Sequence, residues 1–181
     1  IQNSKIDKLI KNNLGNQKLN LIIGGPPCQA YSVAGRIRDK DGMKNDYRNF
    51  LFESYLRIVK KFQPSIFLIE NVPGILSAAP EGTPIKERIA NDIKKIGYAC
   101  SDNFDSCLFD LSGFGIPQKR KRVFILGVNK KIKNYSTLLT NFYQELLNIP
   151  KISVNVKEAI GDLPKLYPLK KNQLTPKQSH S

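Results

Sequence analysis

The stretch from Leu19 to Gly35 constrains this fold more than any other, because an apolar run ends there in two glycines, two prolines and a cysteine. The run 19–23 is short, β-branched and bounded by turn residues, so it predicts a buried parallel strand. Pro26 and Pro27 end that strand, since proline cannot donate to a strand ladder. We therefore expect Cys28 to sit on a stiff support at the carboxyl end of a strand, where open α/β sheets bind ligands.

Most cysteines outside disulfides are small buried hydrophobic residues, and this is the alternative for Cys28. The Gly-Pro platform and the Arg-rich loop 30–45 favour instead a nucleophile held at a fixed attack distance under a closing loop. Cys100 and Cys107 lack such a setting, so we expect them to be structural. The only histidine, His180, lies in a polar tail, which argues against a metal site or a Cys-His pair.

The composition predicts one domain that acts in the cytoplasm. The 181 residues are 40% hydrophobic, enough for one core, and no apolar run is long enough for a membrane span. Three cysteines without a C-x-x-C pair suit a reducing compartment. The net charge of +14 and pI near 9.7 favour nucleic acid as the partner, although a lysine-rich composition from a genome rich in A and T is the alternative.

Predicted helices and strands alternate along the chain, which indicates an α/β fold. The segment 47–62 predicts a helix capped by Asp46, because Leu51, Tyr55, Ile58, Val59 and Phe62 recur at helical spacing. Ser65 to Ile69 predicts a second buried parallel strand that ends at Glu70. Thr83 as N-cap, Pro84, the stripe Ile85, Ile89, Ile93 and Ile96, and then Gly97 predict another helix.

The later part of the chain predicts an antiparallel hairpin and two helices. Residues 98–107 read as extended, 111–117 as a Gly-rich turn, and 123–128 as a buried strand that pairs with the extended segment. Residues 134–148 and 156–162 predict helices, as do residues 4–12 near the start, and the polar tail reads as a linker.

Two further segments carry groups suited to chemistry beside a strand, namely Glu70 and the basic run from Gln118 to Arg122. Taken singly, such a glutamate is more often an ion-pair residue, and such a basic run a solvated face. Arg120 and Arg122 have the same parity entering a strand, so both should point to one face. We expect a parallel sheet to bring these strand ends and Cys28 to one rim.

These segments resemble the DNA (cytosine-5) methyltransferases. Residues 24–32 are similar to the nucleophile motif of that family, 46–52 to its D-x-R-x-x-L-F segment, 70–72 to its E-N-V motif and 118–122 to its Q-x-R-x-R motif. The resemblance covers residues 19 to about 164. It implies a Rossmann-like S-adenosylmethionine-dependent fold, a mostly parallel sheet flanked by helices, incomplete in this chain. Residues 1–164 would form a partial catalytic domain, and 165–181 a linker toward a missing target-recognition region.

The resemblance also implies roles for single residues. Cys28 would add to carbon 6 of a flipped-out cytosine, Glu70 would bind or protonate nitrogen 3, and Arg122 would contact oxygen 2 with support from Arg120. S-adenosyl-L-methionine would supply the methyl group. The remaining residues are cofactor contacts at Pro27 and Leu51 and nucleic-acid contacts at Gln29, Ser32, Arg48 and Gln118, with Ser32 and Arg48 on backbone phosphates.

The chain departs from the family by lacking a Gly-rich cofactor loop and an acidic ribose-binding residue upstream of residue 19, and Asn20 stands where the family often has Asp. We therefore expect an N-terminal or complementary methyltransferase segment as a partner, with double-stranded DNA as the substrate in a restriction-modification system. Two alternatives stay open: a tRNA cytosine methyltransferase, disfavoured because the Cys-Phe-Thr tripeptide of that branch is absent, and a non-catalytic nucleic-acid-binding remnant.

Overall fold

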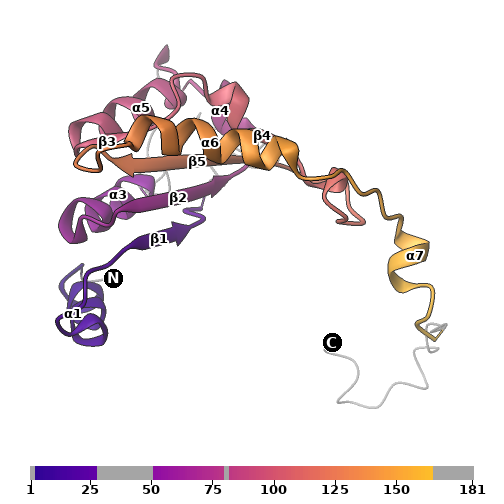
Figure 1. Cartoon of the computed structure of the whole chain (residues 1–181), viewed down its shortest axis with the longest axis horizontal. Helices are drawn as coiled ribbons and strands as arrows, with labels where there is room; N and C mark the ends of the chain where they lie inside the picture. The colour runs from indigo at the N-terminus through magenta and orange to yellow at the C-terminus, as the bar shows by residue number, and fades with distance from the viewer. Residues whose placement is uncertain (1–2, 28–50, 80–81, 165–181) are drawn as a thin grey trace.

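The computed structural model describes residues 3–27, 51–79 and 82–164, which build a sheet with helices on both faces (Figure 1). The strands follow the order β1-β2-β5-β3, and β4 pairs with β5 off this path. Their bounds are β1 Leu21–Gly24, β2 Ile66–Asn71, β3 Tyr98–Ala99, β4 Leu108–Asp110 and β5 Lys121–Asn129. The α/β class predicted from the sequence is confirmed.

The direction of β5 corrects one prediction. β1 and β2 are parallel, as expected, and β5 is antiparallel to β3 and β4, as the predicted hairpin requires, but β5 also runs antiparallel to β2. A parallel β5 would put its beginning at the opposite rim from the end of β2. Because β5 is antiparallel to β2, its beginning lies beside the end of β2. Glu70 and the arginines before and within β5 therefore meet at one rim because the strands are antiparallel, whereas the prediction assumed parallel strands.

Apart from α4, which was not predicted, the described helices lie close to their predicted positions. Their bounds are α1 Asn3–Leu14, α3 Leu51–Phe62, α4 Gly74–Ser77, α5 Ile85–Lys95, α6 Tyr135–Asn148 and α7 Val156–Ile160. The predicted extended segment 98–107 is only partly extended, since Phe104–Cys107 forms a 3-10 turn before β4. The hairpin with β5 is confirmed by both β3 and β4. The predicted cap Asp46 and the linker 165–181 lie outside the described residues.

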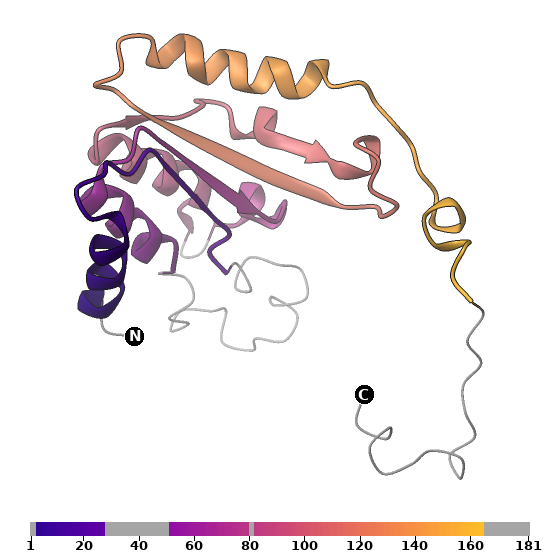
Figure 2. The ribbon, with the colours of Figure 1, turned by 60° about the horizontal axis from the view of Figure 1, so that its bottom comes forward.

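Alternation along β2 divides the core between two faces. On one face, Phe67 contacts Tyr55 of α3, with ring centroids 6.0 Å apart, and Tyr98 of β3, at 5.1 Å. On the other face, Tyr143 of α6 stacks on Phe109 of β4 at 6.5 Å. Figure 2 shows α6 running along the outside of β4 and β5, away from α3 and α5.

The hydroxyl of Tyr143 also completes the outer edge of β5. It accepts a hydrogen bond from the Leu126 amide over 3.1 Å and donates one to the Phe124 carbonyl over 3.0 Å. These two backbone groups lie between the stretches of β5 that pair with β3 and β4. A side chain of α6 thus supplies the hydrogen bonds that a neighbouring strand would otherwise make.

The structure refines the predicted stripe of α3 and corrects the predicted cap of α5. In α3 the buried residues are Phe52, Leu56 and Val59, so Val59 is buried as predicted, whereas the other members of the predicted stripe are half-buried, namely Leu51, Tyr55, Ile58 and Phe62. In α5 the isoleucine stripe is buried as predicted, but the N-cap is Pro84 rather than Thr83 and makes no side-chain cap. Both helices nevertheless turn an apolar face to the sheet, because helical spacing of apolar residues is satisfied in each.

β1 is less buried than predicted. Leu21 is 49% exposed and Ile23 is 65% exposed, and both lie on one face, whereas Ile22 packs against the core. β1 pairs with β2 along one side, and no described strand pairs with its other side. The apolar run was therefore a correct signal for a strand but not for its burial in this chain.

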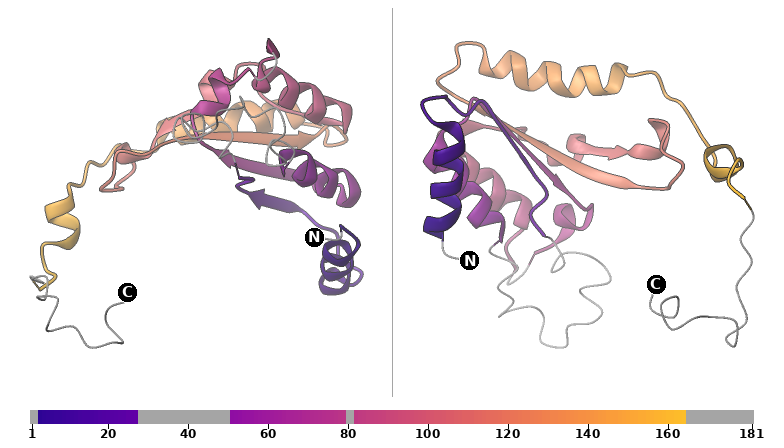
Figure 3. Two further views of the ribbon diagram at one scale, coloured as in Figure 1. Left: turned by 180° about the vertical axis from the view of Figure 1, so that it is seen from behind. Right: turned by 90° about the horizontal axis from the view of Figure 1, so that it is seen from below.

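The first helix and the last helix differ in how they attach. α1 is fixed to α3 because the buried Asp7 carboxylate accepts both terminal nitrogens of Arg57 at 3.0 Å and Lys61 Nζ at 2.6 Å. By contrast, Figure 3 shows α7 apart from the sheet and its covering helices. Among the described helices, none has the length and apolar character that crossing a membrane requires.

Candidate active site

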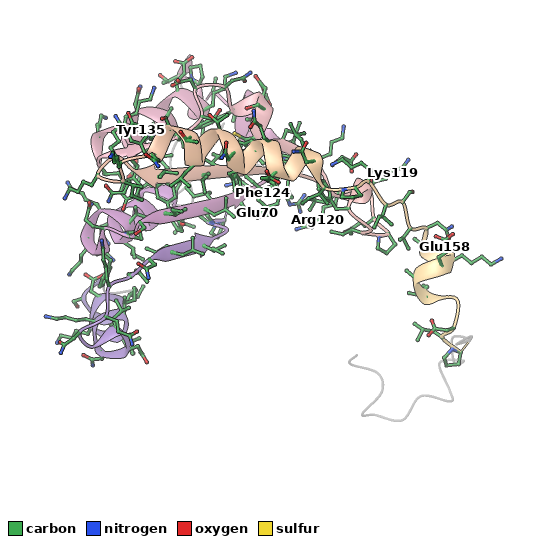
Figure 4. All side chains as sticks on the ribbon, viewed as in Figure 1. Glu70, Lys119, Arg120, Phe124, Tyr135 and Glu158 are labelled. Atoms are coloured by element: carbon green, nitrogen blue, oxygen red, sulfur yellow. The ribbon has the colours of Figure 1, made fainter. Side chains whose placement is uncertain are left out.

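The candidate site lies where β2 ends and β5 begins. Glu70 is the next-to-last residue of β2 and pairs with Phe124 in the register of the two strands. Arg122 and Arg120 stand on the same side of the chain as Phe124, because residues two apart in a strand point to one face. Figure 4 shows Glu70, Phe124 and Arg120 together at this end of the sheet, with Lys119 farther out.

Glu70 and the two arginines form one charged cluster. Arg122 donates from Nε to Glu70 Oε1 over 2.7 Å, and an Nη atom of Arg120 lies 3.5 Å from the same oxygen. The side chains of Glu70 and Arg122 are 35% and 20% exposed, so the pair is partly shielded but open to a ligand. The shared parity of the two arginines is confirmed, since both reach one carboxylate.

Gly25 brings the loop that follows β1 against this cluster. A Cβ atom at Gly25 would lie 3.1 Å from Glu70 Oε2, which is tighter than ordinary packing. The absence of a side chain therefore allows the backbone to approach the carboxylate. Asn71 adds a second tie, because its Nδ2 atom lies 3.5 Å from the Pro26 carbonyl oxygen and its Oδ1 accepts the Val72 amide.

Gly24 has a different reason to be glycine. A Cβ atom there would lie 2.6 Å from the Tyr55 ring, which closes over β1 and β2 from α3. The Tyr55 hydroxyl donates toward the Ile22 and Leu68 carbonyls, both at 3.1 Å. Burial raises the pKa of Tyr55, so this hydroxyl stays protonated and acts as a structural donor.

The described residues bring the Gly24–Pro27 stretch, Glu70 and the arginines to one rim, whereas four predicted site residues lie outside the described part of the chain. Those four are Cys28, Gln29, Ser32 and Arg48. Gln118 is exposed in the turn before β5, where its backbone N–H donates to the Ile116 carbonyl. No described contact joins Gln118 to the charged cluster.

The two described cysteines are structural, as predicted. Cys100 and Cys107 are 5% and 0% exposed. Burial raises the pKa of the Cys100 thiol to about 11 and also raises the pKa of Cys107, whose thiol donates toward the Tyr143 hydroxyl. Neither thiol is in its nucleophilic form near neutral pH. Within the described residues, no His, Cys, Asp and Glu side chains group as metal ligands would.

The two residues assigned to the cofactor offer apolar surface only. Pro27 is exposed at the end of the stretch after β1, and Leu51 is half-buried at the start of α3. The nearest described carboxylate in sequence, Glu53, is paired with Arg88.

One contributor to the rim gives a weak sequence signal. Asn71 is 4% exposed, and its side chain links the stretch after β1 to β2. It lies in the matched segment 70–72, but no role of its own was predicted for it from the sequence. The signal that identifies it is position, because a buried polar residue at a strand end must find a hydrogen-bond partner.

Comparison with known proteins identifies the family that this chain matches. Residues 1–180 match the family described as C-5 cytosine-specific DNA methylase. The chain is 42% identical over 170 residues to Type II methyltransferase M.Bpa9945I of Bacillus paralicheniformis, covering 89% of this chain and 36% of that protein. It is 38% identical over 153 residues to Type II methyltransferase M.MthTI of Methanothermobacter thermautotrophicus, covering 84% and 41%.

A solved structure described as that of a DNA modification methyltransferase encoded within a prophage (E. coli) superposes with a TM-score of 0.59 at 30% identity. That superposition covers 88% of this chain and 39% of the other. The chain thus spans well under half the length of the proteins it matches.

Proposed function

Because the chain belongs to the C-5 cytosine-specific DNA methylase family, we propose that it supplies the nucleophile and the base-binding groups of a DNA cytosine-5 methyltransferase of the restriction-modification type. The observation that carries this proposal is the carboxylate-guanidinium pair of Glu70 and Arg122, held against Gly25 at the rim. In the sequence, the proposed nucleophile Cys28 follows Gly25 by three residues.

The chemistry requires these groups together. Carbon 5 of cytosine is a poor nucleophile, so the Cys28 thiolate first forms a bond to carbon 6, and the electron pair of the 5,6 double bond moves toward nitrogen 3. Glu70 hydrogen-bonds or protonates nitrogen 3, and Arg122 stabilises oxygen 2. After carbon 5 is methylated it loses its proton, the double bond reforms and the carbon-sulfur bond breaks, which restores the thiolate.

Arg120 would position the pair rather than contact the base. It lies 3.5 Å from the oxygen of Glu70 that Arg122 already contacts at 2.7 Å. Two cations on one oxygen leave the other oxygen, which faces Gly25, available to a base. A cytosine entering the rim would then meet both a carboxylate oxygen and a guanidinium.

S-adenosyl-L-methionine is the methyl donor that we propose, and its sulfonium supplies a methyl group open to attack by carbon 5. Pro27 and Leu51 would provide apolar contact to it. Duplex DNA is the proposed substrate, held through Gln29, Ser32, Arg48 and Gln118, with the target base flipped out of the helix. Like other polyanion-binding proteins, the chain has a large positive charge, +14.

A complementary methyltransferase segment is the partner that we propose, and the outer side of β1 supports it. No described strand pairs with that side, and Leu21 and Ile23 expose 49% and 65% of their surface beside it. An apolar strand edge of this kind favours pairing with another strand. We expect the 181 residues alone to bind S-adenosyl-L-methionine weakly or not at all; micromolar binding with methyl transfer to DNA would contradict this partner.

Single-turnover methylation tests the assigned roles in the functional protein that contains this chain. Glu70→Gln keeps the shape but removes the proton donor, so the rate should fall about 10²-fold or more. Lys119→Met is the control, because Lys119 is exposed beside the site and should change the rate little. Unchanged turnover in Glu70→Gln would reduce Glu70 to a structural residue. Methylation of tRNA rather than duplex DNA would assign the other substrate class.

A further inference from the structure

The rim opposite the candidate active site contains a cavity of about 210 Å³. β1 and β2 begin at this end of the sheet and β5 ends there, whereas Glu70 and Arg120 lie at the other end (Figure 4). The lining residues are Lys18, Gln63, Ser65, Asn129, Lys131 and Ile132. None of them takes part in the proposed methyl transfer.

The walls of the cavity are fixed by hydrogen bonds. Asn129 is 6% exposed. Its backbone N–H donates to the Ser65 carbonyl over 3.0 Å, and its side-chain Oδ1 accepts the backbone N–H of Lys131 over 3.1 Å. Gln63 directly follows α3, and its backbone adopts the left-handed region with φ 46. Its side-chain amide donates to the Lys60 carbonyl. The cavity is therefore part of the folded sheet rather than a gap between loose side chains.

The cavity is electrically one-sided. Lys18 and Lys131 line it, no carboxylate does, and neither lysine has an ion pair within the described part of the chain. By contrast, three lysines outside the pocket are paired with carboxylates, namely Lys61 with Asp7, Lys94 with Asp102 and Lys95 with Asp92. The Ser65 hydroxyl makes no hydrogen bond among the described residues, so it remains a donor.

We propose that this cavity, here called the lysine pocket, binds a phosphate group. Lysine ammonium groups are common phosphate ligands, and a serine hydroxyl adds a neutral donor. The volume is below the roughly 300 to 1,000 Å³ of pockets that enclose a drug-sized ligand, so it suits one phosphate rather than a whole nucleotide. The phosphate belongs either to a nucleic-acid backbone that contacts the far rim or to a small phosphate ester.

Titration of the chain with inorganic phosphate at constant ionic strength tests the lysine pocket. Phosphate should shift the amide resonances of Ser65 and Lys131 saturably, and the double variant Lys18→Gln/Lys131→Gln should weaken its affinity about 10-fold or more. Lys130→Gln/Lys133→Gln is the matched control, because it removes the same charge from neighbours that do not line the pocket. Absence of saturable shifts, or equal weakening in both double variants, would overturn the proposal.

A duplex of A·T pairs only distinguishes the two sources of phosphate without involving a target cytosine. If the nucleic-acid backbone is the ligand, the slope of log K against log salt should fall by about 1 to 2 in the pocket variant and stay unchanged in the control. An unchanged slope with intact phosphate binding would assign the pocket to a small phosphate ester. Neither result depends on Cys28 or Glu70, so failure of the proposed methyl transfer would leave this test intact.

Discussion

Gly127→Ala should destabilise the sheet where β5 pairs with β2. A Cβ atom at Gly127 would lie 2.1 Å from two ring carbons of Phe67, its partner in the strand register. Phe67 is fully buried, and the rings of Tyr55 and Tyr98 pack against it, so the Phe67 ring has no free space into which it can move. Overpacking of this kind costs about 1 to 3 kcal/mol, and we expect a value near the top of that range.

Urea unfolding of the 181-residue chain measures this cost. With an m value of about 2 kcal/mol per M, the midpoint should fall by about 1 M or more. Adding Phe67→Leu should relieve the clash, so the double variant should be more stable than the sum of the single effects by about 1 kcal/mol or more. Gly113→Ala is the control, since its nearest neighbour is the flexible end of Lys151 at 3.3 Å.

The outcome bears on the site as well as on stability. The register that sets Phe67 opposite Gly127 also sets Glu70 opposite Phe124, two residues from Arg122. A Gly127→Ala variant within about 0.5 kcal/mol of the parent, or strict additivity in the double variant, would refute that register.

Two further predictions concern other parts of the fold. Tyr143→Phe should lower the free energy of unfolding by about 2 kcal/mol, because the Leu126 amide and the Phe124 carbonyl lose their partner; Tyr135→Phe is the control in the same urea assay, and an equal loss there would contradict the assignment. Arg57 and Lys61 hold the pKa of Asp7 at about 2, so the contribution of this carboxylate to stability should be complete above about pH 4 and disappear as the pH falls toward 2. Asp7→Asn should remove that part of the acid-unfolding transition. An unchanged acid transition in this variant would contradict the role given to Asp7.

The order of helices and strands was predictable because each has a local signal. The isoleucine stripe of α5 between Pro84 and Gly97 is one such signal, and the structure buries Ile85, Ile89 and Ile93 as expected. The direction of β5 relative to β3 and β4 was predictable as a hairpin, but its direction relative to β2 has no local signal. That pairing joins segments far apart in sequence, and a basic run before a strand is compatible with either direction.

Burial of β1 was also beyond the sequence. Leu21 and Ile23 have the apolar character of core-strand residues, but their exposure depends on what covers them. For the site, the sequence placed Glu70 and the arginine pair on one rim, and the structure confirms that they meet. The tie from Asn71 to Pro26 was not predictable, because it requires the distance between two chain segments that lie far apart in sequence.

The role of Cys28 is the central claim, and covalent trapping tests it most directly. In the functional protein that contains this chain, duplex DNA with 5-fluorocytosine should form a covalent complex with Cys28, because carbon 5 then carries no proton to lose and the carbon-sulfur bond cannot break. Peptide mapping by mass spectrometry should locate the adduct at Cys28, and Cys28→Ser should abolish it, since an alcohol ionises far less readily than a thiol. An adduct at Cys100 or Cys107, or methylation of ordinary cytosine by the Cys28→Ser variant, would contradict the account.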